Sequence, residues 1–167
     1  GSFERKLETY LSDHFPMRRT LTSLDAHVQL YTGRNGQRGV YAGKDGYLIG
    51  VPIQAGQEKY SANLKVIESF AREIGIPCML MPVPSKGFVM SDKLPTNHVE
   101  YPDGDMLVRA QRELTYTEIV QVEEDLRRGT KEENCQIFYK TDHHWTHLGS
   151  YFAYREFCSV SDNMASE

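Results

Sequence analysis

A helix-forming segment followed at once by an apolar strand constrains the fold of this chain most strongly. Apolar side chains recur at helical spacing between residues 58 and 73, and Gly75 is suited to end the helix. Ile76-Pro77 then begins a nearly all-apolar run at residues 78–83. Such a run is typical of a strand covered on both faces, as in a parallel sheet. The apolar stripe of the helix comprises Tyr60, Leu64, Ile67, Phe70, Ala71 and Ile74.

Weaker signals predict the elements on the N-terminal side. Apolar spacing predicts one helix from about Phe3 to Leu11, closed by Pro16, and a second from Leu21 to Tyr31. Asp45-Gly46 lies between two short runs that favour β structure, which predicts a hairpin at residues 40–49.

The C-terminal part completes an α/β order. Three prolines predict an irregular loop around Ser85-Lys86, and helices are expected at about 105–114 and 117–128. Residues 132–139 are predicted to form a second central strand, followed by a helix from about Leu148 that packs on the sheet through Tyr151, Tyr154, Phe157 and Cys158. This order fits parallel strands joined by helices.

We therefore expect one domain over residues 1–167, with a three-layer α/β architecture, a parallel central sheet and a β-hairpin. Two central strands are few for an open sheet, so we expect the N-terminal part of a larger unit. Gly1-Ser2 resembles a cloning remnant, which leaves open a signal peptide or membrane anchor upstream.

The composition limits the classes of function that this chain can have. Apolar residues make up 40% and charged residues 25%, the net charge is -4, and no basic tract occurs. These values are typical of a folded soluble protein and argue against nucleic-acid binding. The cysteines Cys78, Cys135 and Cys158 match no zinc or disulfide spacing, and the first two are expected to be buried thiols whose redox state stays open.

The sequence Asp142-His143-His144-Trp145-Thr146 carries the clearest chemical signal. It follows a run that favours a strand, so its side chains are expected at the rim of a sheet, where α/β proteins place their sites. A carboxylate can fix the tautomer of a histidine, and that histidine can then deprotonate a serine hydroxyl.

These residues resemble the DHHW protein family, within the wider group of SGNH-hydrolase-like proteins that includes the alginate O-acetyltransferases. The literal match is Asp142-His143-His144-Trp145. Three further blocks fit in order along the chain. They are Asp13-His14-Phe15-Pro16 with Arg18, residues 39–48, and Pro82-Val83-Pro84-Ser85-Lys86 followed by Leu94-Pro95.

The resemblance implies an SGNH-hydrolase-like fold and an exported bacterial esterase or O-acyltransferase that acts on cell-envelope carbohydrate. It implies that His144 is the catalytic base and that Asp142 orients it. His143 is then the variable position, Trp145 walls or braces the site, and Thr146 caps the next helix or bonds the loop. No cofactor and no metal are implied.

The family's nucleophile lies in a Gly-Asp-Ser motif further along the chain, and that tripeptide does not occur in this sequence. Gly104-Asp105 is followed by Met106, and Ser150 is predicted to be a helix residue. Ser85, in the loop after a strand, is the best serine available. We therefore expect this chain alone to be inactive, with the serine supplied from outside it.

Two other functions stay open. The chain could be a non-catalytic carbohydrate- or envelope-binding module that keeps the motif as architecture. Alternatively, Asp142, His143, His144 and His147 could form the metal site of a hydrolase. The expected partner is a carbohydrate or an acyl ester, the expected location is extracytoplasmic, and the oligomeric state is not predicted.

Overall fold

The computed structural model describes residues 2–14, 17–37, 39–54, 56–132 and 134–165. Phe15, Pro16 and the side chains of Asp13, His14 and Arg18 lie outside this description, so the first resemblance block cannot be placed. In chain order the helices are α1 Ser2–His14, α2 Arg18–Tyr31, α3 Gln57–Ile74, α4 Lys86–Val89, α5 Asp103–Glu113, α6 Glu123–Lys131 and α7 His147–Ala165. The strands are β1 Gly36–Gln37, β2 Val40–Ala42, β3 Leu48–Gly50, β4 Met79–Leu80 and β5 Glu118–Ile119, with short 3₁₀ turns at Lys44–Gly46 and Ser91–Lys93.

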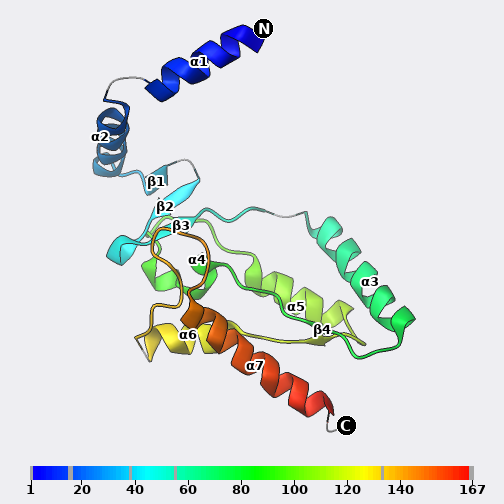
Figure 1. The fold of residues 1–167 in the computed structure, drawn as a ribbon. Helices are drawn as coiled ribbons and strands as arrows, with labels where there is room; N and C mark the ends of the chain where they lie inside the picture. The colour runs from blue at the N-terminus through cyan, green and yellow to red at the C-terminus, as the bar shows by residue number, and fades with distance from the viewer. Residues whose placement is uncertain (1, 15–16, 38, 55, 133, 166–167) are drawn as a thin grey trace.

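The two N-terminal helices and the hairpin confirm the prediction for this region. Figure 1 shows α1 and α2 extending away from the rest of the chain. β2 and β3 pair antiparallel around a turn in which Asp45 has a φ of 56° and Gly46 a φ of 78°. Positive φ at these positions is what an Asp-Gly turn favours. β1 adds a third strand beside β2.

Helix α3 is present with its predicted stop at Gly75, which takes the left-handed conformation at a φ of 64°. Leu64 and Ala71 are buried, and Leu64 packs in a cluster with Ala110 and Leu114. The predicted stripe is only partly correct, because Phe70 and Ile74 are exposed.

A parallel pair of strands, β4 and β5, is the sheet beside α3 and α5 (Figure 1). Leu80 pairs with Ile119, and the N–H of Val120 donates to the carbonyl of Leu80 at 2.9 Å. The prediction of a parallel sheet is confirmed. However, β4 is shorter than predicted and its residues are half-buried, so it is not covered on both faces.

The partner strand was assigned to the wrong segment. Residues 117–122 are not helical as predicted, because polar and β-branched side chains alternate there and leave Thr117, Val120 and Val122 buried. The predicted central strand at 132–139 is also wrong. In that segment Phe138 forms only an isolated antiparallel bridge with Trp145, because the chain folds back on itself.

Glu68 of α3 fixes the turn that leads into β5. Its carboxylate accepts hydrogen bonds from the N–H groups of Thr115 at 3.0 Å, Tyr116 at 2.8 Å and Thr117 at 3.2 Å. Burial acts to raise the pKa of Glu68, but these hydrogen bonds outweigh it and lower the pKa to about 2.

The main core lies between the hairpin, α4, α6 and α7. Its members are buried side chains from these elements and from the segment between α6 and α7, including Ile49, Val89, Leu126, Ile137, Phe138 and Phe152. The predicted face of α7 is wrong, because Tyr151 and Tyr154 are 54% and 63% exposed. Gly149, Phe152 and Ala153, at helical spacing, form its inner face instead.

The loop after β4, the cysteines and the helices bear on the remaining predictions. The irregular loop after β4 contains α4 and a 3₁₀ turn, so it is more ordered than expected. Cys78, Cys135 and Cys158 are half-buried thiols. None of the helices in the described ranges has the length and apolar character that crossing a bilayer requires.

Candidate functional site

The Asp-His motif lies on the loop that joins α6 to α7. An antiparallel bridge between Phe138 and Trp145 closes the base of this loop, and the N–H of Tyr139 donates to the carbonyl of His144 at 3.2 Å. The loop runs beside the hairpin, since the N–H of Leu48 donates to the carbonyl of Lys140 at 2.7 Å. The loop that carries the motif is thus tied to the hairpin, which is distant in sequence (Figure 1).

Asp142 and His144 form a hydrogen-bonded pair. Oδ1 of Asp142 lies 2.6 Å from Nδ1 of His144 and also accepts the backbone N–H of His144 at 3.0 Å. These hydrogen bonds, the backbone one first, lower the pKa of Asp142. An ionised carboxylate can only accept, so Nδ1 carries the hydrogen and Nε2 is left as the proton acceptor. This is the arrangement that prepares an imidazole for general-base chemistry.

His143 is the outermost residue of the motif, with its side chain 85% exposed. Its Nδ1 lies 3.4 Å from Oδ1 of Asp142, and its ring stacks at a tilt on the His144 ring at 3.9 Å between centroids. The shorter contact belongs to His144, so the geometry favours His144 over His143 as the oriented imidazole.

Trp145 and Thr146 connect the motif to the fold. Trp145 is half-buried against the main core. The Thr146 hydroxyl donates to the carbonyl of Gln136 at 2.7 Å and accepts the N–H of Gly149 at 3.2 Å. The second bond caps the first turn of α7. Gly149 allows the close approach of helix and loop, since a Cβ there would lie 2.5 Å from the carbonyl oxygen of Ile137.

Lys86 is a buried cation beneath this loop, and the sequence reasoning gave it no role. Its Nζ donates to the carbonyls of Leu48 at 2.6 Å, Tyr139 at 2.7 Å, Lys140 at 3.0 Å and Asp142 at 3.0 Å. Burial lowers the pKa of Lys86, and the charge of Asp142 partly offsets this effect. The available signal was a lysine placed in an otherwise apolar stretch, next to Gly87-Phe88-Val89-Met90.

A groove of about 540 Å³ runs along one side of the motif. His143, His144 and Trp145 line it, as do Ser85 and Asp103. The Ser85 hydroxyl donates to Oδ2 of Asp103 at 2.9 Å, and its N–H donates to Oδ1 at 2.6 Å. The best serine of the sequence therefore shares the groove with His144, while its hydroxyl is bonded to a carboxylate. Ser150 is a residue of α7, as predicted.

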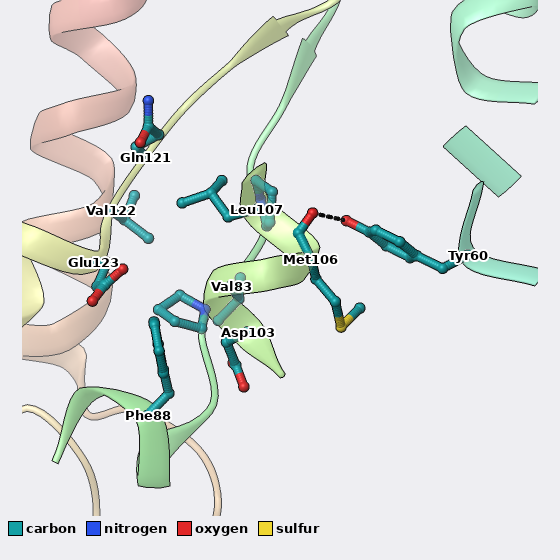
Figure 2. Close-up of a pocket in the computed structure, with 11 residues that line it drawn as sticks. Tyr60, Val83, Phe88, Asp103, Met106, Leu107, Gln121, Val122 and Glu123 are labelled. Atoms are coloured by element: carbon teal, nitrogen blue, oxygen red, sulfur yellow. Dashed lines mark hydrogen bonds between the residues drawn. The ribbon is translucent and has the colours of Figure 1, made fainter. Parts of the chain in front are cut away.

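A smaller apolar pocket of about 260 Å³ adjoins the groove and shares Val83, Pro84, Asp103 and Met106 with it. Figure 2 shows Val83, Phe88, Leu107 and Val122 around this pocket, with the Tyr60 hydroxyl donating to the carbonyl of Met106 at 3.1 Å. The pocket follows the carboxyl ends of β4 and β5, where open parallel sheets bind ligands.

The motif also gathers ligand atoms of the kind that hold metals. Asp142, His143 and His144 each offer one such atom, and these atoms lie within 4.8 Å of one another. His147 lies in the first turn of α7 instead. In the described part of the chain this is the cluster that could hold an ion, and its three side chains are exposed.

Comparison with known proteins then identifies the family. The family described as "SGNH hydrolase-like domain, acetyltransferase AlgX" matches residues 40–164, well over half of the chain. The chain belongs to this AlgX-type SGNH hydrolase-like family. The resemblance inferred from the motif blocks, and the SGNH-hydrolase-like fold class, are confirmed.

Individual relatives agree with the AlgX-type assignment. The chain is 24% identical over 157 residues to the probable alginate O-acetylase AlgJ of Pseudomonas syringae pv. tomato, covering 90% of this chain and 40% of that relative. The O-acetyltransferase domain of Pseudomonas putida AlgJ shares the fold at a TM-score of 0.64 and 20% identity, covering 76% of this chain and 48% of that one. A DHHW family protein from Eubacterium siraeum matches at a TM-score of 0.58 and 25% identity, covering 74% and 39%. The chain thus spans less than half of the length of each of these relatives.

Proposed function

We propose that this chain carries the base and its orienting carboxylate for an SGNH-like esterase or O-acyltransferase that acts on extracytoplasmic carbohydrate. In this proposal residues 1–167 are part of a single SGNH-like domain, His144 is the base and Asp142 orients it. The observation that carries the proposal is the 2.6 Å contact between the two side chains, which leaves Nε2 as the proton acceptor of a histidine that lines the groove.

The reaction uses a serine from outside these 167 residues. Nε2 of His144 takes the serine hydroxyl proton while the serine oxygen attacks the carbonyl carbon of an acyl ester. The bond from that carbon to the alcohol oxygen breaks, and the imidazolium returns the proton to the departing alcohol. A sugar hydroxyl or water then attacks the acyl-serine, again with its proton going to Nε2, and the serine is regenerated.

Asp142 acts in both halves of this reaction without giving up or taking a proton. Its carboxylate holds Nδ1–H and stabilises the imidazolium when Nε2 is protonated. The lowered pKa of Asp142 keeps the group ionised for that purpose. His143 has no step of its own, and Trp145 forms part of the groove wall.

Family membership supports the chemistry, and the names of the relatives point to O-acetyl transfer on polysaccharide. The relative from Pseudomonas syringae is named as a probable alginate O-acetylase, so an acetylated envelope or secreted polysaccharide is the proposed class of acceptor. Hydrolysis and transfer differ only in whether water or a sugar hydroxyl attacks the acyl-serine.

Labelling with a fluorophosphonate, which reacts with activated serines, tests this proposal. We expect the natural gene product to gain one adduct by intact mass and the 19.2 kDa chain alone to gain none. We also expect His144→Ala to suppress labelling of the gene product and His143→Ala to leave it intact. An adduct on the 19.2 kDa chain at Ser85 would show that the nucleophile was misassigned. Labelling that is insensitive to His144→Ala would contradict the role of His144.

A metal-dependent hydrolase is the second candidate, favoured by the convergence of Asp142, His143 and His144 within 4.8 Å. In the structure, the hydrogen bond between Oδ1 of Asp142 and Nδ1 of His144 leaves Nε2 of His144 open to a metal ion as well as to a proton, so the same contact fits either chemistry. A chelator therefore distinguishes the two candidates.

A further inference from the structure

Four backbone carbonyls converge on the ammonium group of Lys86, which is the buried polar feature nearest to the proposed site. One comes from Leu48 of β3. The others come from Tyr139, Lys140 and Asp142 of the loop between α6 and α7, which we call the motif loop. All four lie 2.6–3.0 Å from Nζ. An ammonium has three N–H donors, so four acceptors use its full capacity. We refer to this arrangement, Nζ with its four carbonyls, as the lysine cage.

The cage is buried, and no carboxylate of the described residues bonds its ammonium. Lys86 is 5% exposed, and among the described residues its partners are the carbonyls and the face of the Tyr47 ring, with Nζ 5.3 Å from the ring centroid. A buried charge is costly unless hydrogen bonds satisfy it, and carbonyls turned toward one another need a donor between them. The buried ammonium therefore needs these carbonyls, and the loop conformation that brings the carbonyls together needs the ammonium.

The proposed base pair, in contrast, is exposed. The side chains of Asp142 and His144 are 51% and 65% exposed, so packing around these side chains does not hold them in place. Their orientation depends on the backbone from which they project. The carbonyl of Asp142 belongs to the cage, while its carboxylate bonds the N–H and the ring of His144.

We propose that Lys86 is a positioning residue whose buried ammonium fixes the backbone of residues 139–142, so that the Asp142 carboxylate orients His144. Its importance for catalysis rests on the proposed function, while its effect on the loop can be measured without any turnover. Preorganisation of this kind, by a buried group behind an exposed one, is a general requirement for a functional constellation.

The test compares Lys86→Met with Lys93→Met. The Lys93 ammonium bonds the carboxylates of Asp45 at 2.6 Å and Asp92 at 3.3 Å, so its removal changes the charge equally without touching the cage. Two signals of His144 report the loop. They are the hydrogen exchange of its backbone N–H, which donates to Asp142, and the imidazole ¹⁵N shifts, which show the nitrogen that carries the hydrogen.

In Lys86→Met we expect exchange of the His144 N–H to rise by on the order of tenfold or more, because the carbonyls of Leu48, Tyr139 and Asp142 lose the donor that holds them together and the loop opens. We also expect the single Nδ1–H tautomer to be replaced by a mixture. Lys93→Met should change neither signal. An unchanged exchange rate and tautomer in a folded Lys86→Met protein would overturn the proposal.

If Lys86→Met does not fold, the unaltered protein provides a second test. In protein labelled with ¹⁵N-lysine, the caged ammonium should exchange its hydrogens more slowly than exposed lysines do, and equally fast exchange would overturn the proposal. The positioning role of Lys86 and the proposed function can fail independently of each other. Altered loop signals in Lys86→Met, together with a natural gene product that shows no acyl turnover, would leave Lys86 as a positioning residue and reject the function. Turnover that needs His144 but tolerates Lys86→Met would do the reverse.

Discussion

His144 and Asp142 are joined twice through one oxygen atom, since Oδ1 of Asp142 accepts both the backbone N–H and the ring Nδ1 of His144. The backbone hydrogen bond fixes where the carboxylate lies, and the ring hydrogen bond fixes the imidazole relative to it. This arrangement orients an exposed histidine with only local residues, provided that the loop itself is held in place.

Replacing Asp142 with Asn tests the orienting role. The amide keeps the size of the side chain but loses the charge, and an amide nitrogen placed at Oδ1 would repel the donors of His144. We expect acyl turnover by the natural gene product to fall by about 10²–10⁴-fold, with the thermal unfolding temperature nearly unchanged because the group is exposed. Steady-state kinetics with an aryl acetate, beside a thermal melt, measures both. Undiminished turnover would show that Asp142 does not orient the base.

Gly149→Ala should deform the base of the loop. An added Cβ would lie 2.5 Å from the carbonyl oxygen of Ile137 and 2.9 Å from Cβ of Trp145. Such overpacking costs about 1–3 kcal/mol of the free energy of unfolding. Gly56→Ala is the matched control, because no atom lies within 4 Å of the Cβ it would add. Denaturant unfolding of the two variants should separate them, and equal stability would contradict the packing described for α7.

Glu68→Gln should destabilise the fold in a pH-dependent way. The pKa of Glu68 is lowered from 4.5 to about 2, so its contribution is present above about pH 4.5 and is lost as the pH falls toward 2. We expect the variant to lose about 1–3 kcal/mol at neutral pH and to show a weaker acid dependence of stability over that interval. Urea unfolding from pH 7 to pH 2 measures this. Glu73→Gln, an exposed position on the same helix, is the control, and similar curves for both variants would contradict the role of Glu68.

The sequence predicted the local elements well and their pairing less well. The α3 segment has apolar residues at helical spacing, ends at a glycine and is followed by a strand. Each of these signals lies within the segment or directly after it. The partner of β4 was misplaced because residues 117–122 contain both helix-compatible polar residues and the β-branched alternation that the structure uses. Tertiary hydrogen bonds to Cys78 and Leu80 determine the outcome, and no local pattern contains that information.

In the candidate site too, contacts between neighbours in sequence were predictable and contacts between distant segments were not. Asp142 and His144 are two positions apart, so their contact was predictable from the motif. The cage around Lys86 joins β3 and the motif loop, which lie far from α4 in sequence, and only the folded chain brings these carbonyls together. The inner face of α7 was misassigned because Tyr151 and Tyr154 follow helical spacing, and so do Gly149, Phe152 and Ala153. Packing alone decides between the two faces.

Removal of metal ions tests the alternative chemistry. If His144 is a general base, a chelator should leave acyl turnover by the gene product unchanged, and added Zn²⁺ should not raise it. The physical reason is that the proposed proton transfer uses only Nε2 of His144, the Asp142 carboxylate bonded to its Nδ1, and a serine hydroxyl. Turnover lost on dialysis against the chelator and restored by Zn²⁺ would favour the metal-dependent hydrolase.

The most direct test of the account measures acyl-ester turnover by the natural gene product carrying His144→Ala or His143→Ala. Both residues are exposed and adjacent, so the two substitutions disturb the fold to a similar, small extent. We predict that His144→Ala lowers turnover by about 10²–10⁴-fold and that His143→Ala leaves it close to that of the unaltered protein. Equal turnover in the two variants, or a greater loss in His143→Ala, would contradict the assignment of His144 as the base that Asp142 orients.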